Sequence, residues 1–591
     1  SGGEKVNDFM HLNEILRSGS FPPYDAWLAG FRVNMYYYFG TYVIATLAEL
    51  TGTPGSIAYN IGMSLIPALA ANAAFGIGYN LTNDRKTGIF SMFMIIFAGN
   101  LYPAAIVAAH VLGMTSTPWG NVPDIIDFWN ATRVIPYTIN EFPYFSFIFG
   151  DLHAHVIAIP FVLLAVTLIL GSYFSKNISG TAAVFLALCI GTLFAFNSWD
   201  YFTYAALFVL VLMARSALNS RSLSSRSEKF FGLLRSFGLG LSILILGSIM
   251  ILVFIIDFKS AGIQGIKPVL ERTALINFLV VYDLFLFLIF SFLLINLPKL
   301  RYKKWILVLL LGIGIDMYFS PNFQTLSVFM PLALLSGINI YSFYKNNDTG
   351  RLFTSVLIVI GLGILVFCEL FYFDDLLGGP WERMNTVFKY YIQVWILWGI
   401  ASAYAFYDIY KKKYRMKNII LMMLLFLVLL NSIYIFTGTY AKTDRFSHGP
   451  GLDGMAYMKK TNGGNYDAIY WINKNLNRTQ VILEAPGESY KDTSLLSAFT
   501  GNPTVIGWVG HEIMWRNDWK EISQRIADVD IIYNTTDQSE AALLLKKYNV
   551  SYVSVGDVEL KKYKAEGFNK FKDTSYFEPV YRGALELYRV K

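Results

Sequence analysis

The feature that most constrains the fold is a series of long apolar runs between residues 57 and 438. Only 15% of the 591 residues are charged, whereas a soluble protein has about 25%. A run of about 20 apolar residues can cross a bilayer, and it must do so as a helix because lipid offers the backbone no hydrogen-bond partners. The sequence therefore predicts a polytopic α-helical membrane protein. The twelve predicted spans are 57–81, 88–112, 147–172, 181–198, 201–218, 237–257, 274–297, 304–319, 326–344, 351–373, 387–410 and 417–438.

Basic loops predict the orientation of these spans in the plasma membrane. If the twelve spans alternate, four basic loops fall on one side, which the excess of Lys and Arg marks as cytoplasmic. These loops are 84–86, 215–235, 299–304 and 411–417. Both chain ends and the loops 113–146, 258–273 and 374–386 are then extracytoplasmic. Because the chain opens on that side, we expect a preceding span that was removed or lies outside this sequence, which would make thirteen.

Composition also narrows the partners. The net charge of +7 resides mostly in the basic loops, and no basic patch interleaved with aromatic residues predicts a nucleic-acid partner. Cys189 and Cys368 both lie in predicted spans, so the sequence predicts neither a disulfide framework nor a zinc framework. The bilayer is the one partner that composition establishes, and the oligomeric state stays open.

Three regions are predicted. Residues 1–56 form an extracytoplasmic loop with interfacial or re-entrant helices, since a full crossing by the apolar stretch 35–50 would reverse every later loop. Residues 57–440 form the transmembrane bundle, and residues 441–591 form a soluble extracytoplasmic α/β domain. Hydrophobic periodicity predicts helices at 8–16, 466–476 and 538–548, and strands at 481–486, 550–555 and 585–590.

Asp151, His153 and His155 stand where a long apolar segment begins. Ionisable groups at the edge of a span are costly and usually mark a functional site. Asp151 and His155 share a face of a regular helix, whereas all three align if the entry to the span is extended. Oxygen and imidazole ligands suit Mn²⁺, Mg²⁺ or Zn²⁺. The alternative is that Asp151 caps the helix that follows while the histidines bond to nearby carbonyls.

A second polar group, Glu382, Arg383 and Lys389, enters a later span from the same side. Arg and Lys pair well with an anionic phosphate at the membrane surface. We expect Glu382 either to complete a metal shell or to hold Arg383. The alternative is a solvated loop with an Arg–Glu pair and a lysine that snorkels to the interface.

The remaining candidates lie in extracytoplasmic segments. Glu4 and Asp8 are candidate general bases, or merely solvated acids. The segment 507–516 is predicted to be an acceptor-binding loop, with a domain-docking surface as the alternative. Its candidate residues are Trp508, His511, Glu512, Trp515 and Arg516. Supporting positions are Asn197, Trp199 and Asp200 between two spans, and Tyr36, Tyr37 and Tyr38 in an interfacial aromatic belt.

Together these segments resemble the Chlor_Arch_YYY membrane proteins of archaea and Chloroflexi-type bacteria. The motifs that carry the resemblance are 36–38, 145–155, 197–200, 382–389 and 507–512. More distantly, the layout resembles the GT-C glycosyltransferases, above all the oligosaccharyltransferase catalytic subunit and also the protein mannosyltransferase type. These enzymes use sugars linked to polyprenyl phosphate.

The resemblance to the GT-C enzymes assigns roles to individual positions. It implies that Asp8 is the acid that opens the first loop and that Glu382 is the glutamate of a later loop. Asp151-Leu152-His153 stands where those enzymes have Asp-x-Asp, so His153 replaces the second aspartate. Their Trp-Trp-Asp motif is absent, and the segment 507–516 stands nearest to it.

The predicted function is transfer of a sugar from a polyprenyl-phosphate donor to a glycan, lipid or surface-protein acceptor. Asp8 or Glu4 would be the base, and Arg383 and Lys389 would bind the phosphate. Mn²⁺ or Mg²⁺ would be held by Asp151, His153 and Glu382, with His155 as a further ligand. The alternatives are transfer of a whole oligosaccharide, a transporter or flippase for lipid-linked glycans, and a non-catalytic scaffold for the surface layer.

Overall fold

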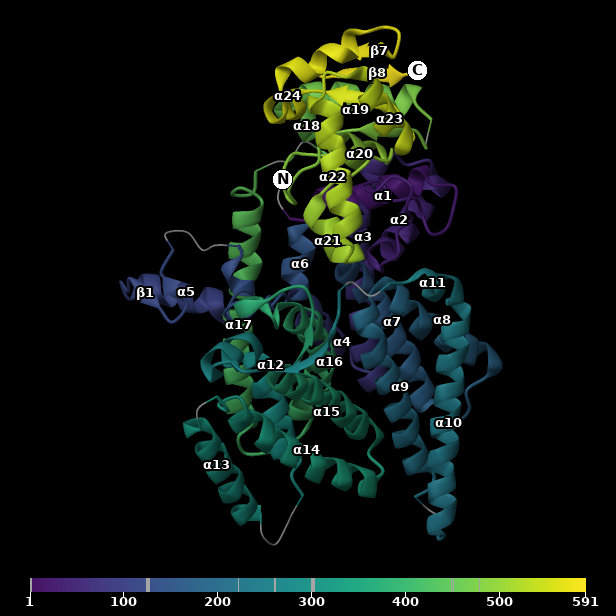
Figure 1. The fold of residues 1–591 in the computed structure, drawn as a ribbon. Coiled ribbons are helices and arrows are strands. Elements are labelled where there is room, and N and C mark those ends of the chain that lie inside the picture. The colour runs from purple at the N-terminus through teal and green to yellow at the C-terminus, as the bar shows by residue number, and fades with distance from the viewer. Residues whose placement is uncertain are drawn as a thin grey trace.

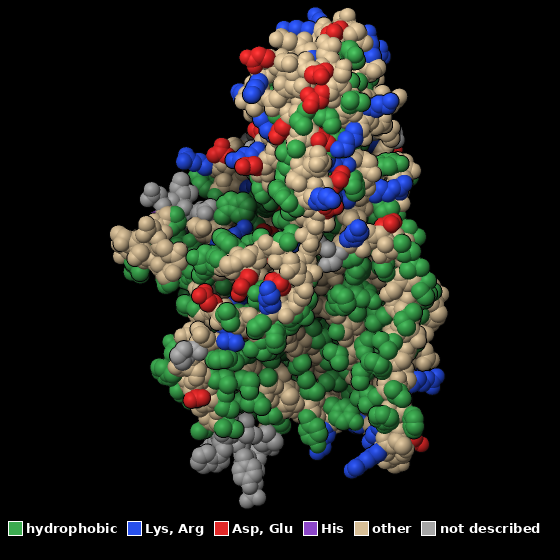
Figure 2. All heavy atoms as spheres, in the orientation of Figure 1, with side chains coloured by type: hydrophobic (Ala, Val, Ile, Leu, Met, Phe, Trp, Pro, Cys, Tyr) green, Lys and Arg blue, Asp and Glu red, His purple; other side chains and the backbone are tan. Residues whose placement is uncertain are grey.

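The computed structural model describes residues 3–123, 128–221, 223–259, 262–298, 303–320, 322–447, 449, 451–477 and 479–591, with the backbone alone for 303–307. A helical bundle occupies one end of the molecule and the C-terminal domain the other (Figure 1). The helices of the bundle present a broad band of hydrophobic side chains, with Lys and Arg gathered beyond it at both ends (Figure 2). The chain is a multi-pass membrane protein.

Nine helices in the described part of the chain are long and apolar enough to cross a membrane. They are α3 (Gly55–Thr82), α7 (Ala154–Phe174), α9 (Ser198–Asn219), α10 (Arg226–Met250), α12 (Leu275–Ile295), α14 (Leu326–Asn346), α15 (Thr349–Leu370), α16 (Met384–Lys411) and α17 (Lys417–Lys442). A tenth candidate is a broken pair, in which α4 (Arg85–Met92) with the π-helix η1 (Phe93–Phe97) meets α5 (Tyr102–Val111) at 76°.

The structure thus supports nine or ten spans rather than the predicted twelve. The predicted spans 181–198 and 304–319 fall on shorter helices, α8 (Gly180–Phe196) and α13 (Lys303–Phe319). A helix of 17 residues is about 25 Å long, less than the hydrocarbon core of about 30 Å. Most of the predicted basic loop 299–304, namely residues 299–302, lies outside the described residues.

Short elements precede and connect the long helices of the bundle. The predicted helix 8–16 lies within α1 (Lys5–Arg17), and the apolar stretch 35–50 forms α2 (Tyr37–Thr51), which is too short to be a candidate span. The others are α6 (Pro143–Phe149), α11 (Leu252–Asp257), β1 (Ser116–Thr117), β2 (Gly120–Asn121), β3 (Gly265–Pro268), β4 (Phe371–Asp374), η2 (Asn130–Thr132) and η3 (Gly379–Trp381). β1 pairs with β2, and β3 with β4, both antiparallel.

The C-terminal domain has a mixed four-stranded sheet in the order β5-β6-β8-β7. β5 (Val481–Leu483) and β6 (Val550–Val555) are parallel, while β8 (Glu586–Val590) runs antiparallel to β6 and to β7 (Phe577–Arg582). The surrounding helices are α18 (Ala456–Thr461), α19 (Gly463–Asn475), α20 (Leu495–Thr500), α21 (Val509–Arg516), α22 (Trp519–Asn534), α23 (Gln538–Lys547), α24 (Asp557–Lys562) and η4 (Ala565–Lys572). The predicted helices and strands of this region fall on α19, α23, β5, β6 and β8.

The chain between α1 and α2, which we call the N-terminal segment, packs against this domain. Its backbone pairs with residues 504–507: Ala29 N–H donates to the Thr504 carbonyl at 2.9 Å, and Gly507 N–H to the Trp27 carbonyl at 2.8 Å. Leu28 and Ala29 belong to the hydrophobic core of the domain. Helix α1, which follows Glu4, is therefore held between the bundle and the C-terminal domain.

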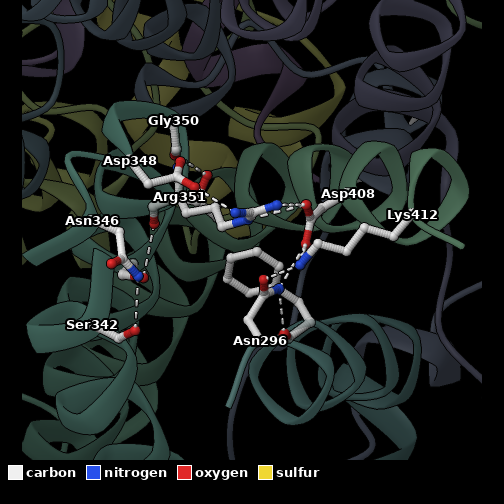
Figure 3. Close-up of polar contacts among 11 residues, drawn as sticks. Asn296, Ser342, Asn346, Asp348, Gly350, Arg351, Asp408 and Lys412 are labelled. Carbon is white, nitrogen blue, oxygen red and sulfur yellow. Dashed lines mark hydrogen bonds and ion pairs between the residues drawn. The ribbon is translucent and has the colours of Figure 1, made fainter. Parts of the chain in front are cut away.

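A second polar network ties helix ends together within the bundle (Figure 3). Arg351, near the start of α15, donates to Asp408 of α16 at 2.6 and 3.1 Å and also pairs with Asp348. Asn296, after α12, donates to the other oxygen of Asp408 at 2.6 Å, and Lys412 lies 3.5 Å from it. Each charge has an opposite charge or an amide beside it, so we regard this network as a structural link between three helices.

Candidate functional site

Asp151 lies against the start of helix α1. Its Oδ2 accepts the backbone N–H of Glu4 at 2.9 Å, and its Oδ1 accepts from Lys5 Nζ at 2.6 Å. Asp151 does not cap the following helix, because α7 begins after His153 without a side-chain cap. A carboxylate at a helix N-terminus is favoured by the helix dipole, so α1 and Lys5 together hold Asp151 in place.

Asp8, one turn into α1, is buried and left with a free oxygen. Its Oδ1 lies 3.8 Å from His153 Nδ1, and its Oδ2 has no hydrogen-bond partner among the described residues. Burial, followed by the charges of Asp151 and Glu4, raises the pKa of Asp8 well above its usual range. Burial also raises the pKa of Asp151 to about 6 and lowers the pKa of His153 well below its usual range.

Glu4 is held by the C-terminal domain. His511 Nε2 lies 2.9 Å from Glu4 Oε2, the Tyr490 hydroxyl donates to Glu4 Oε1 at 2.6 Å, and Ser489 Oγ lies 2.8 Å from His511 Nδ1. Burial acts to raise the pKa of Glu4, but the hydrogen bonds from His511 and Tyr490 and the charges of His511 and His153 together outweigh it and lower the pKa to about 2. Glu4 is therefore an ionised carboxylate with both oxygens occupied.

The other predicted residues near the bundle have different partners. His155 Nε2 lies 3.4 Å from Glu141 Oε2, and its ring packs against the ring of His153. Glu382 accepts a hydrogen bond from the Tyr372 hydroxyl at 3.1 Å. Arg383 donates to Glu369 Oε1 and to the Cys368 carbonyl, both at 2.9 Å. The structure thus joins Glu4, Asp8, Asp151 and His153, while Glu382 and Arg383 bond to residues at the end of α15 and in β4.

The carboxylates and histidines do not fit a metal ion in this arrangement. No group of three or more His, Cys, Asp or Glu side chains among the described residues is placed to hold one. Asp151 already has Lys5 and the Glu4 N–H on its two oxygens. The metal site stays a prediction, and no step proposed below passes through a metal.

Lys389 lines a cavity of about 310 Å³ beside this group. We call it the aromatic cavity, because Tyr36, Tyr37, Phe194, Trp199, Phe202, Phe258, Phe373, Tyr390 and Trp515 form most of its wall. Lys389 is the only Lys or Arg among its described lining residues. The Nζ atom is buried, has no hydrogen-bond partner there, and lies 4.3 Å from the centre of the Phe388 ring.

The aromatic cavity adjoins the group of Glu4, Asp8, Asp151 and His153. The ring of Tyr37, which lines the cavity, packs edge-on against His153 with 5.1 Å between centroids. Lys389 is near enough to His153, Glu141 and Asp200 for its charge to affect the protonation of these three side chains. Asp200 accepts a hydrogen bond from Asn197 Nδ2 at 2.9 Å, and Trp199, which lies between these two residues in the chain, lines the cavity.

The segment 507–516 is mostly helix α21 and not the predicted loop. Trp508 packs against Trp27 at 4.7 Å between ring centroids, and Arg516 pairs with Glu512 at 2.8 Å and with Asp25. These residues lie between the N-terminal segment and the C-terminal domain. Three described residues of this segment reach the site: His511 meets Glu4, and Met514 and Trp515 line the aromatic cavity.

Other predicted and unpredicted residues complete the picture. Tyr36 stacks on Tyr37 with 4.6 Å between centroids, whereas Tyr38 packs against Phe254. Sequence reasoning missed Lys5 and Tyr490. Neither belongs to a motif, and each meets its carboxylate across at least 146 residues of chain.

The family is decided by the sequence model that matches residues 1–398 and is described as uncharacterized membrane protein DUF2298. The chain belongs to this family. The finer Chlor_Arch_YYY assignment stays a prediction. No curated protein matches the chain.

Solved structures show distant similarity. The oligosaccharyltransferase of Archaeoglobus fulgidus, in complex with Zn and sulfate, is 13% identical with a TM-score of 0.44, and the match covers 94% of this chain and 64% of that one. The same archaeal enzyme, AglB, with an inhibitory peptide and a dolichol-phosphate is 11% identical with a TM-score of 0.42, over 94% and 65%. ArnT from Cupriavidus metallidurans bound to undecaprenyl phosphate is 11% identical with a TM-score of 0.39, over 100% and 93%. The chain therefore spans less than two thirds of the length of the archaeal enzyme.

Proposed function

We propose that this protein transfers a sugar from a polyprenyl-phosphate donor to a hydroxyl group of an acceptor at the extracytoplasmic face of the membrane. The observation that carries the proposal is the buried ammonium of Lys389, a residue that lines the aromatic cavity; the ammonium has no hydrogen bond or ion pair among the described residues. A buried charge without a partner is costly. The site therefore favours a ligand that brings an anion.

A lipid-linked phosphate has the properties that this cavity requires. Its phosphate would meet Lys389, and its apolar chain would lie along the aromatic and aliphatic wall near the lipid-facing surface of the bundle. Arg383 is engaged by Glu369 and by backbone carbonyls, so its role would be to fix the segment before α16. Lys389 alone would then bind the donor phosphate directly.

Asp8, whose Oδ2 has no hydrogen-bond partner among the described residues, would receive the proton of the acceptor. In the proposed step the acceptor oxygen attacks the anomeric carbon of the donor sugar, and its proton passes to Asp8. The bond between that carbon and the phosphate oxygen breaks, and the electron pair leaves with the lipid phosphate. Lys389 would stabilise the charge that develops on this leaving group. The products are the glycosylated acceptor and the polyprenyl phosphate.

The order of acids along the chain is a second support. Asp8, the Asp151-x-His153 motif and Glu382 follow the order that the sequence resemblance to GT-C glycosyltransferases implies. Glu382 accepts a hydrogen bond from the Tyr372 hydroxyl, so it would act through Tyr372 rather than at the reacting atoms. The proposed reaction allows either a single sugar or a whole oligosaccharide as the transferred group. The mass added to the acceptor would distinguish the two.

The test replaces Lys389 with Met, which keeps the length of the side chain and removes its charge. We expect Lys389→Met to weaken binding of polyprenyl phosphate in nanodiscs about tenfold or more, and to lower sugar transfer about 10²–10³-fold in membranes that supply the lipid-linked donor. Lys411→Met is the matched control, since Lys411 ends the same helix and pairs with Asp84. Binding of polyprenyl phosphate by Lys389→Met at the level of the wild-type protein would refute the proposal.

A further inference from the structure

A second cavity, of about 350 Å³, adjoins the same carboxylates from another direction. It is lined by the first turns of α1 and α3, by Gly150, by the segment 451–454 with Tyr457 of α18, and by Phe499 of α20. We call it the α1–α3 cavity. The α1–α3 cavity and the aromatic cavity have no described lining residue in common.

Asp151 lies directly behind the wall of the α1–α3 cavity. Lys5 lines the cavity and donates to Asp151 at 2.6 Å. Gly3 also lines it, and a Cβ added to Gly3 would lie 2.6 Å from Asp151 Oδ2. The hydroxyl of Tyr59 bridges Gly150 and Leu152, the two neighbours of Asp151 in the chain. The aromatic cavity reaches this group from the side of Tyr37 and His153, so the carboxylates separate the two cavities.

The lining of the α1–α3 cavity suits a neutral polyhydroxyl ligand. Phe9, Tyr59, Tyr457 and Phe499 offer aromatic faces on which the C–H face of a sugar ring can pack, and Asn60 and Asp453 offer polar groups for its hydroxyls. The only cation in its described lining, Lys5, is already paired with Asp151. A second anionic lipid would meet no free positive charge there, whereas a saccharide needs none. The volume is within the range of about 300–1,000 Å³ found for ligand pockets.

We propose that the α1–α3 cavity binds a neutral saccharide and presents one of its hydroxyl groups to the carboxylates as the acceptor. This inference rests on the proposed function, since it assigns the acceptor of that reaction. It places the acceptor between α1, α3 and the segment before α18, and not on the predicted residues of α21.

The test measures saccharide binding without turnover. Saturation-transfer NMR on the full chain in nanodiscs would use the methyl glycosides of glucose, galactose, mannose and N-acetylglucosamine as probes. We expect at least one glycoside to bind. Tyr457→Ala, which removes an aromatic wall, and Val6→Trp, which fills the cavity from α1, should each weaken that binding about tenfold or more, a loss of about 1.4 kcal/mol. Tyr470→Ala is the matched control, because Tyr470 is an exposed aromatic residue on the neighbouring helix α19, outside the cavity.

The outcomes separate this inference from the proposed function. If no glycoside binds, the α1–α3 cavity is not a saccharide site. The same conclusion follows if Tyr457→Ala and Val6→Trp both bind the glycoside as well as the wild-type protein does, while their melting temperatures equal that of the wild-type protein. Loss of polyprenyl-phosphate binding in Lys389→Met would still support the donor site in that case. Conversely, glycoside binding that depends on Tyr457 and Val6 would stand even if Lys389→Met bound the lipid phosphate normally.

Discussion

Three carboxylates lie together at the start of α1, and their partners give them different proton affinities. Glu4 has His511 and Tyr490 on its oxygens, and Asp151 has Lys5 and a backbone N–H. Asp8 has one oxygen without a hydrogen-bond partner in the part of the chain that the structure describes. Burial raises the pKa of a carboxylate. The partners of Glu4 outweigh burial and lower its pKa to about 2, those of Asp151 leave its pKa raised to about 6, and the pKa of Asp8 is raised well above its usual range. Asp8 is therefore the carboxylate with the greatest affinity for a proton, as a general base requires.

This difference predicts how the proposed sugar transfer depends on pH. Asp8 must be deprotonated to accept the acceptor's proton, and its pKa is raised, so the rate should rise as pH increases. Asp151→Asn removes a neighbouring negative charge and releases Lys5, and both changes lower the pKa of Asp8. The rise should therefore move to lower pH. The measurement is the rate of transfer in membranes between about pH 5 and pH 9.

Glu488→Gln provides the control for the Asp151 variant, because it removes an exposed carboxylate of the C-terminal domain. Its profile should coincide with that of the wild-type protein. A profile for Asp151→Asn that stays in place or moves to higher pH would contradict the assignment of Asp8 as the base.

Among the elements, those with strong local patterns could be predicted and those set by distant contacts could not. A short run typical of a buried strand predicts β6 with its observed bounds, Val550–Val555. The apolar run 88–112 instead reads as one span, yet the helix breaks before α5. At the break, Gly99 N–H donates to the carbonyl of Asn431 and Leu101 N–H to that of Val280. Residues on α17 and α12 thus supply the hydrogen bonds that the local helix gives up.

The same limit applies to the candidate site. Its acids and histidines could be named from the sequence, because ionisable residues beside apolar runs are conspicuous. Their pairing could not be predicted, because Glu4 meets His511 across 507 residues and Lys5 meets Asp151 across 146. The sequence likewise cannot show that Arg383 would pair with Glu369 while the Lys389 ammonium has no hydrogen bond or ion pair within the described part of the chain.

Helix α21 carries a buried cluster that titrates. Glu512, Asp25 and Glu14 are fully buried and lie around the single guanidinium of Arg516, with His11 bonded to Glu14. Burial, followed by the charge of Asp25, raises the pKa of Glu512 to about 8, and burial raises that of Glu14 well above its usual range. One positive charge cannot balance three carboxylates, so the cluster retains protons near neutral pH.

A raised pKa in the folded state fixes the sign of the effect on stability. The contribution of protonated Glu512 is fully present below its unfolded pKa of 4.5 and is lost as pH rises through about 8. The melting temperature of the wild-type protein should therefore fall by several degrees between pH 6 and pH 9, since about 1 kcal/mol shifts it by about 2–4 °C in a unit of 150–250 residues. Glu512→Gln, which cannot ionise, should show a smaller fall.

Tryptophan fluorescence can follow this transition, because Trp27, Trp508 and Trp515 pack together beside the cluster. Glu521→Gln is the control on the neighbouring helix α22, where the carboxylate is partly exposed and pairs with Arg525. An equal fall in melting temperature for the wild-type protein and Glu512→Gln would show that Glu512 does not hold a proton at this interface.

At the scale of the whole molecule, the C-terminal domain contributes residues to the candidate site. It supplies His511 and Tyr490 to Glu4, its residues 504–507 pair with the N-terminal segment, and Gly454 N–H donates to the Ser56 carbonyl at the start of α3. These contacts fix the position of α1, on which Lys5 and Asp8 depend.

Removing one of these contacts should therefore affect the chemistry more than donor binding. His511→Ala removes a partner of Glu4 and should loosen the start of α1, which displaces Lys5 and Asp8 relative to Asp151. We expect sugar transfer to fall about tenfold or more, because small misplacements of catalytic groups can be costly. Binding of polyprenyl phosphate at Lys389 should stay near the wild-type level. Hydrogen exchange in residues 5–17 should become faster, whereas His110→Ala, on the remote helix α5, should change none of the three. Unchanged exchange in α1 together with unchanged transfer would mean that the C-terminal domain only rests on the bundle and does not shape its site.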